Sequence, residues 1–256
     1  MSERSDPRPG KGAMSLWDHI GELRRRLIRV LIVFAVALAG GLFGADPAFD
    51  FLVAAAPSEK LELNAFSPWD AVGLYVKIGV LIALAVTVPY AFYELWAFVR
   101  PGLLPKERRA TLRFVPAAAL LFAVGLAFAY FVVFPMAFLF TERVTASMGL
   151  KQTYGVGQYF AFMMNILLPV SLLFELPLVI LFLTRIGILS PALLDRMRRV
   201  AWFLLVLLAT MITPPDVISD LLVSVPLIAL YEFSVGLAKI AHRRRQAALQ
   251  RWNGSE

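Results

Sequence analysis

Long apolar stretches separated by short charged connections organise this chain. Four nearly uncharged stretches, at 27–44, 71–99, 114–140 and 158–184, are long enough to cross a hydrocarbon core of about 30 Å. Two shorter apolar segments follow, at 200–212 and 221–238. Thirteen helical residues reach only about 20 Å, so the first of these either crosses a thinned bilayer or re-enters it. The pattern predicts an all-α membrane protein with six transmembrane helices, of which the last two are short; a re-entrant final hairpin is the alternative.

Proline residues recur inside these apolar stretches or at their margins. Each proline removes a helix hydrogen bond and favours a kink. We therefore expect bent helices that enclose a glove-like concave shape, although membrane helices also tolerate proline generally. The prolines concerned are Pro89, Pro116, Pro135, Pro169, Pro177 and Pro226.

Composition supports lipid as the main solvent. Hydrophobic residues make up 59% of the 256 residues, against roughly 45–50% in soluble domains. The chain has no cysteine, which excludes disulfides and thiolate metal sites, and its two histidines leave little for a histidine metal cluster. A net charge of +7 would suggest nucleic acid in a soluble protein. In a membrane protein the distribution of that charge indicates instead which side of the membrane each connection faces. From the composition we expect no cofactor, no metal and no nucleic-acid partner.

The basic residues are placed unevenly. All but four of the 25 Lys and Arg lie at or before Arg29, in the second and fourth connections, or after the last span; the exceptions are Lys60, Lys77, Arg143 and Lys151. Under the positive-inside rule both termini are cytoplasmic. We expect a disordered cytoplasmic tail at 1–13, a membrane domain at 14–240 and a basic cytoplasmic tail at 241–256.

Two carboxylates lie among these arginines. The segment 15–31 has helical amphipathic periodicity, and on it Glu22 precedes Arg25 and Arg26 by three and four residues, the spacing of helix ion pairs. Glu107 follows a short turn that contains Pro101 and Pro105. Two such carboxylates at the membrane edge could together bind a guanidinium in bidentate geometry. A solvated helix face beside anionic lipid is the alternative for Glu22.

A few acids interrupt the apolar stretches. Glu175 has 23 uncharged residues before it and nine after it, so we expect it to face inward as a polar site. Glu94 and Glu232 fit positions near the cytoplasmic interface. Asp216 is placed to cap the last helix. The chain has no phosphate-binding loop, His-Glu-x-x-His zinc motif or Gly-x-Ser-x-Gly turn, and we therefore expect no enzyme.

Five stretches resemble the TatC family, the polytopic receptor subunit of the twin-arginine protein translocase. They occur in family order across about residues 15–240, at 19–27 (HIGELRRRL), 96–109 (WAFVRPGLLPKERR), 128–135 (FAYFVVFP), 174–177 (FELP) and 213–216 (TPPD). The resemblance implies a protein of the bacterial or archaeal cytoplasmic membrane that exports folded proteins with the protonmotive force. It implies TatA and TatB-type single-span partners near the fifth and sixth spans, lipid contact and self-association.

The resemblance also implies roles for particular residues. Glu22 and Glu107 would bind the twin-arginine motif of a substrate's signal peptide, with Arg24 and Phe98 in the same site. Glu175 would be the membrane-embedded acid, and Pro57, Thr213 and Asp216 would lie in outward-facing loops. One departure is Asp220, where a neutral polar residue is expected. The main alternative function is a proton-coupled small-solute transporter with Glu175 as its relay; an intramembrane hydrolase would need a nucleophile or metal site that the sequence does not supply.

Overall fold

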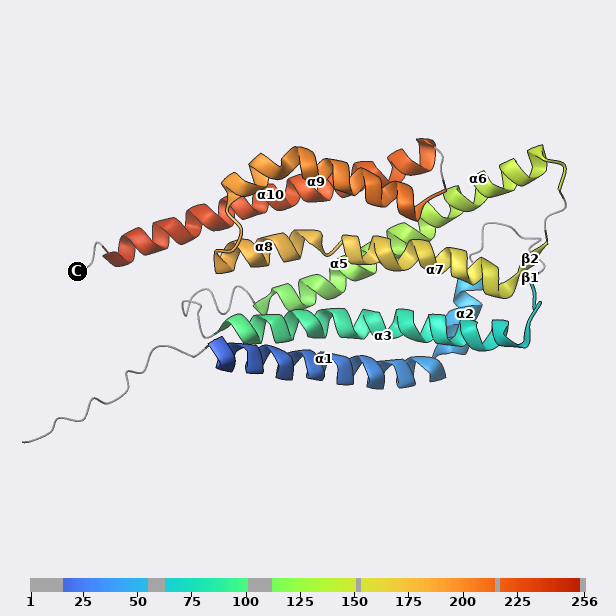
Figure 1. Cartoon of the computed structure of the whole chain (residues 1–256), viewed down its shortest axis with the longest axis horizontal. Helices are drawn as coiled ribbons and strands as arrows, with labels where there is room; N and C mark the ends of the chain where they lie inside the picture. Colours follow the sequence, from blue (N-terminus) through green and yellow to red (C-terminus); the bar gives the residue numbers. More distant parts are fainter. Residues whose placement is uncertain (1–15, 55–62, 101–111, 151–152, 215–216, 254–256) are drawn as a thin grey trace, which may run out of the picture.

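The computed structural model describes residues 16–54, 63–100, 112–150, 153–214 and 217–253, and in these ranges the protein is almost entirely helical (Figure 1). Two short strands of two residues each pair in parallel, Leu63 with Tyr154 and Asn64 with Gly155. The elements in chain order are α1 (Leu16–Phe43), α2 (Ala45–Ala54), β1 (Leu63–Asn64), α3 (Pro68–Val99), α5 (Phe114–Phe128), the π-helix η2 (Ala129–Val133), α6 (Phe134–Ser147), β2 (Tyr154–Gly155), α7 (Val156–Leu173), α8 (Leu176–Ile186), α9 (Pro191–Ile212) and α10 (Val217–Asn253).

Most helices follow the long axis of the molecule, and the α7–α8 pair occupies the middle of the bundle (Figure 1). On one side α7 packs against α3 and α5, and α3 in turn carries α1. On the other side α9 and α10 form a hairpin that contacts α7 and α8. The buried core accordingly centres on α7, with Phe160, Met163, Ile166 and Leu167 fully enclosed.

The bundle has two chemically different ends (Figure 1). At one end α1, α5 and α9 begin and α3 and α8 end. We call it the arginine end, because most of the described arginines gather there, whereas Arg143 lies on α6 toward the other end. The arginines at this end include Arg24, Arg25, Arg26, Arg29, Arg100, Arg113, Arg185, Arg196, Arg198 and Arg199. We call the opposite end, which holds α2, β1 and β2, the strand end. The first turns of α1 and the last turns of α10 both lie at the arginine end, as the uneven placement of basic residues predicts.

Five helical segments in the described ranges are long and apolar enough to span a membrane: Gly21–Phe43, Pro68–Val99, Phe114–Ser147, Val156–Arg185 and Val217–Arg243. They include the four long predicted stretches and the last one, so the prediction of a multi-span all-α protein is confirmed. The predicted span at 200–212 lies within α9, which is not among them, because the first turns of α9 carry Asp195, Arg196, Arg198 and Arg199. A sixth span therefore stays a prediction.

The last helix is longer than its apolar segment indicates. α10 continues past residue 238 to Asn253, because the intervening residues include neither glycine nor proline to interrupt it. A predicted span ends where the apolar residues end, whereas the helix itself can continue through polar residues until a helix-breaking residue interrupts it. The segment predicted as a basic tail at 241–256 thus begins as helix.

Two of the prolines coincide with breaks in the helices. A π-helical turn, η2, precedes Pro135, and the fourth span divides into α7 and α8 just before Pro177. α3, α7 and α10 continue through their internal prolines. Between α7 and α9 lies an open groove of about 630 Å³ lined by Asn165, Leu168, Leu172, Leu208 and Met211. The expected concavity therefore has a structural counterpart between these two helices.

Glycines set the approach of α1 to α3. A Cβ atom on Gly41 would lie 2.8 Å from the backbone oxygen of Gly79 and 3.2 Å from its Cα. Small residues permit such backbone contact between membrane helices. The opposite surface of α1 exposes Leu27, Leu31, Ile32 and Val36, which suits a helix that faces lipid.

Candidate functional site

A carboxylate and an arginine pair on the first turns of α1 at the arginine end. Arg26 Nε donates to Oε1 of Glu22 over 3.1 Å, and a second guanidinium nitrogen donates to the same oxygen. The two residues are four apart, the spacing that places side chains one above the other on a helix. The Glu22 side chain keeps 25% of its surface exposed and that of Arg26 keeps 14%. Glu22 therefore lies at the accessible edge of this pair, with Arg26 behind it.

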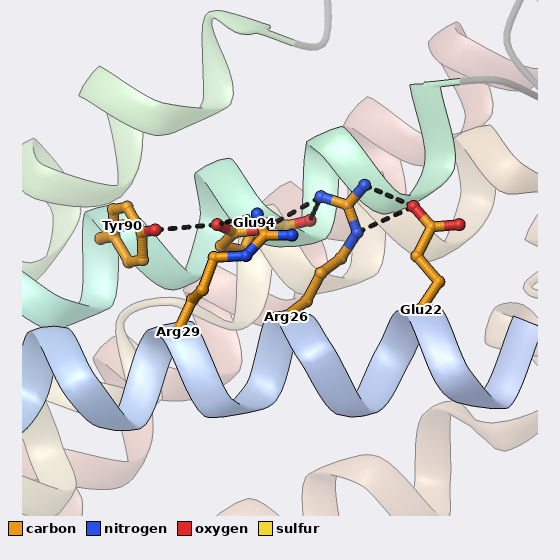
Figure 2. A network of polar contacts seen from close by, with 5 residues as sticks. All are labelled: Glu22, Arg26, Arg29, Tyr90 and Glu94. Atoms are coloured by element: carbon orange, nitrogen blue, oxygen red, sulfur yellow. Dashed lines mark hydrogen bonds and ion pairs between the residues drawn. The ribbon is translucent and has the colours of Figure 1, made fainter.

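Behind Arg26 lies a second carboxylate, Glu94 of α3, which is only 3% exposed (Figure 2). Arg26 Nη1 donates to Oε2 of Glu94 over 3.0 Å, and Arg29 Nη1 donates to Oε1 over 2.9 Å. The Tyr90 hydroxyl donates to Oε1 over 2.8 Å. A buried carboxylate is tolerated when it is paired and hydrogen-bonded, and Glu94 has both. We call Glu22, Arg26, Arg29, Tyr90 and Glu94 the α1–α3 network.

The network places charges in an alternating row. Figure 2 shows Glu22, Arg26, Glu94 and Arg29 following one another along the α1–α3 contact. Two carboxylates face two guanidinium groups, so the charges balance. The Phe98 ring, in the last turn of α3, lies against Arg26, whose Cζ atom is 6.0 Å from the ring centroid, a distance suited to a cation–π contact.

Glu175 lies in the middle of the molecule, where α7 gives way to α8. It is 4% exposed, as the sequence predicts, and in the described part of the protein neither carboxylate oxygen has a hydrogen-bond partner. Neighbouring Phe174 packs tightly on α5, where a Cβ on Gly125 would come within 2.7 Å of its Cβ. A carboxyl group in such surroundings is held at a cost in stability.

A smaller polar contact closes the α9–α10 turn at the strand end. The Thr213 hydroxyl donates to Oδ1 of Asp220 over 2.7 Å, and Thr213 is buried. At the arginine end the same hairpin is held by an ion pair of Arg198 with Glu232, which also accepts from Trp202 Nε1 over 2.9 Å. Glu232 thus serves hairpin packing, and it lies in the middle of α10 rather than near a helix end, because α10 continues to Asn253.

Comparison with known proteins decides between the functions that this geometry allows. The sequence model of one family, Sec-independent protein translocase protein (TatC), matches residues 18–226. This chain belongs to the TatC family. It is therefore a component of a protein translocase and a multi-pass membrane protein, which favours protein transport over the small-solute transporter.

Relatives and solved structures agree with this TatC assignment. The chain is 42% identical over 233 residues to TatC of Halalkalibacterium halodurans and 40% identical over 233 residues to TatCy of Bacillus subtilis. In each comparison 91% of this chain and 92% of the relative are covered. A crystal structure described as twin arginine translocase receptor TatC matches with a TM-score of 0.73 at 30% identity, over 87% of this chain and 99% of that one. A second, obtained in DDM, matches with a TM-score of 0.75 at 28% identity, over 86% of this chain and 99% of that one.

The fold gathers some of the residues that the TatC resemblance singles out and leaves others apart. Glu22 and Phe98 both flank Arg26. Arg24 is exposed and lies two positions from Glu22, so the two side chains point to different sides of α1. Thr213 lies at the opposite end of the bundle. The remaining members of the predicted set, Glu107, Pro57 and Asp216, lie outside the described residues.

Sequence analysis missed the partners of Glu94 in this TatC chain. It placed Glu94 near the membrane interface but did not join it to Arg26 and Arg29, which are 68 and 65 residues away. A signal was present in the sequence, since Tyr90 and Glu94 are four apart on α3, as Glu22 and Arg26 are on α1. Among the residues that the structure describes, no group of three or more His, Asp or Glu could hold a metal.

Proposed function

We propose that this chain is the signal-peptide receptor of a twin-arginine translocase and that Glu22 binds an arginine of the signal. The two solved structures that it resembles are described as twin arginine translocase receptors. One observation carries the residue assignment: Glu22 lies at the exposed edge of the α1–α3 network, and Oε2 points away from Arg26 (Figure 2). An ionised carboxylate in that position suits a guanidinium, which binds carboxylates through charge-assisted hydrogen bonds.

Other residues at the arginine end complete the proposed site. Phe98 is proposed as the aromatic member of the site, since its ring lies 6.0 Å from the Arg26 guanidinium that pairs with Glu22. Glu107 is proposed as the second carboxylate on the basis of its sequence motif, and Arg24 as a further contact. Glu175 is proposed as the membrane-embedded acid of the export step, and its burial at the junction of α7 and α8 supports this assignment.

The proposal includes the setting of the receptor. The arginine end faces the cytoplasm across the cytoplasmic membrane, so both termini are cytoplasmic, and Pro57, Thr213 and Asp216 belong to the outer side. Single-span partners of the TatA and TatB type dock on the α9–α10 hairpin, where α9 exposes Phe203, Leu207 and Met211. The receptor also contacts lipid, associates with copies of itself, and exports folded proteins with the protonmotive force.

Peptide binding to the full chain in detergent tests this function. The probes are two synthetic signal peptides that differ only in Arg-Arg or Lys-Lys, and we expect the Arg-Arg peptide to bind the wild-type chain more tightly. Glu22→Gln should weaken Arg-Arg binding about tenfold or more, because it removes a charge-assisted hydrogen bond of about 1.5–3 kcal/mol. Asp195→Asn is the matched control: it removes one exposed negative charge at the same end but on α9. Equal loss in both variants would refute the assignment of Glu22.

A further inference from the structure

Arg26 already occupies the carboxylate that the proposed function assigns to the signal. Two of its nitrogens donate to Oε1 of Glu22, so only Oε2 of that carboxylate points outward (Figure 2). A guanidinium binds a carboxylate best through two parallel bonds, one to each oxygen. An incoming arginine can make that arrangement with Glu22 only if Arg26 releases Oε1.

Glu94 gives Arg26 a place to remain after that release. Arg26 Nη1 already donates to Oε2 of Glu94 over 3.0 Å and approaches its main-chain oxygen at 3.4 Å. These contacts and the Phe98 ring do not involve Glu22, so Arg26 would stay paired when it leaves Glu22. Arg29 is the other cation paired with Glu94, and it keeps 51% of its side chain exposed. Its guanidinium can therefore share Glu94 with Arg26, or turn to water and leave the carboxylate to Arg26.

We propose that Arg26 is a displaceable internal competitor for the signal, and that signal binding transfers Arg26 from Glu22 to Glu94. This inference rests on the proposed function, because it deepens the role of Glu22. Glu94 is then a positioning residue: it touches no signal residue but lowers the cost of vacating Glu22. The structure assigns this device to the row of charges along α1 and α3.

The exchange also gives a physical basis for preferring arginine to lysine. Arg26 makes two hydrogen bonds to Glu22, so a signal residue that displaces it must make at least two hydrogen bonds to the same carboxylate. The planar arginine side chain can do so, with one bond to each carboxylate oxygen. A lysine ammonium is a compact point charge without that fork. An arginine of the signal therefore displaces Arg26 from Glu22 more easily than a lysine does.

Affinities of the Arg-Arg and Lys-Lys peptides for variants of the full chain in lipid nanodiscs test the inference. Arg26→Gln removes the competitor and should bind the Arg-Arg peptide about threefold to fivefold more tightly, the scale of a partly exposed ion pair. Arg26→Gln should also reduce the ratio between the affinities of the Arg-Arg and Lys-Lys peptides. Arg25→Gln is the control, since Arg25 is exposed in the same turn and outside the network, and it removes an equal charge.

A double-mutant cycle tests the part played by Glu94. Glu94→Gln alone should weaken Arg-Arg binding, because Arg26 is then left with Glu22 as its main anionic partner. The same change in an Arg26→Gln background should have little effect. A thermal unfolding curve for each variant verifies that the protein is folded.

Several results would overturn the inference. Equal gains in Arg26→Gln and Arg25→Gln would mean that only distant charge matters, and a loss of binding in Arg26→Gln would make Arg26 a support for the signal. An effect of Glu94→Gln that persists without Arg26 would remove the transfer step. If instead the wild-type chain does not distinguish the peptides, or Glu22→Gln binds normally, the proposed function itself fails; loss in Glu22→Gln with no gain in Arg26→Gln refutes only the competitor.

Discussion

Replacing either of two adjacent glycines of α1 with alanine should have opposite effects on stability. A Cβ on Gly41 would lie 2.8 Å from the oxygen and 3.2 Å from the Cα of Gly79, and 3.2 Å from the Cβ of Ile82. A Cβ on Gly40 would meet no atom within 4 Å. The obstacle at Gly41 is mostly backbone, which has no rotamer that could move it aside. Gly41→Ala must therefore push α1 away from α3, whereas Gly40→Ala leaves the contact unchanged.

The size of the difference follows from a cancellation. Each substitution gains about 0.5–1 kcal/mol in helix propensity, and the two gains are nearly equal because the residues are neighbours in one helix. Only Gly41→Ala also bears the cost of overpacking, about 1–3 kcal/mol. The two variants should thus differ by about 1–3 kcal/mol, with Gly40→Ala the more stable and at or above wild type.

Thermal unfolding of both variants in one detergent, followed by tryptophan fluorescence, measures this difference. For a chain of this size about 1 kcal/mol corresponds to a Tm shift of roughly 2–4 °C, so Gly41→Ala should melt several degrees below Gly40→Ala. Equal Tm values, or a higher value for Gly41→Ala, would refute the reasoning that α1 and α3 are in backbone contact at Gly79.

Two further predictions concern the buried acid and the sidedness. Glu175→Met removes a carboxyl group whose buried oxygens have no hydrogen-bond partner in the described structure, so it should raise the free energy of unfolding by about 1–3 kcal/mol. The same variant should abolish export of a twin-arginine reporter. A Tm below that of the wild type would contradict the predicted gain in stability. Because the chain has no cysteine, single cysteines introduced by Ser147→Cys at the strand end and Ala192→Cys at the arginine end can report the topology. A membrane-impermeant maleimide should label Ser147→Cys in intact cells and Ala192→Cys only in opened membranes. The reverse labelling pattern would mean that the protein has the opposite orientation.

Local composition predicted those features that depend on the surrounding solvent. An uninterrupted apolar stretch has few stable alternatives to a membrane helix, since lipid leaves every backbone group to be satisfied within the segment. The four long spans and the burial of Glu175 follow from that constraint alone. The limits of α10 did not follow from it, because the apolar stretch ends well before the helix does.

Pairing between helices could not be predicted in the same way. Whether Glu94 meets Arg26 and Arg29 depends on the rotation and crossing of α1 and α3, and these depend on the contact of Gly41 with Gly79. Hydrophobic periodicity shows which face of a helix is apolar but not which residue of another helix lies opposite. Sequence motifs identified Glu22 and Phe98 as site residues, yet gave no indication that an arginine of the same chain lies between them.

The sequence was therefore sufficient for the class of protein, its long spans, the segregation of its positive charge and its resemblance to the TatC family. These properties are carried by short stretches of chain, each of which responds to lipid or water independently of the others. The tertiary structure alone decided that Glu22 is shared with Arg26 and that Arg26 has Glu94 as a second partner. A charge network across two helices forms only where close backbone packing brings residues from distant parts of the sequence within hydrogen-bond distance.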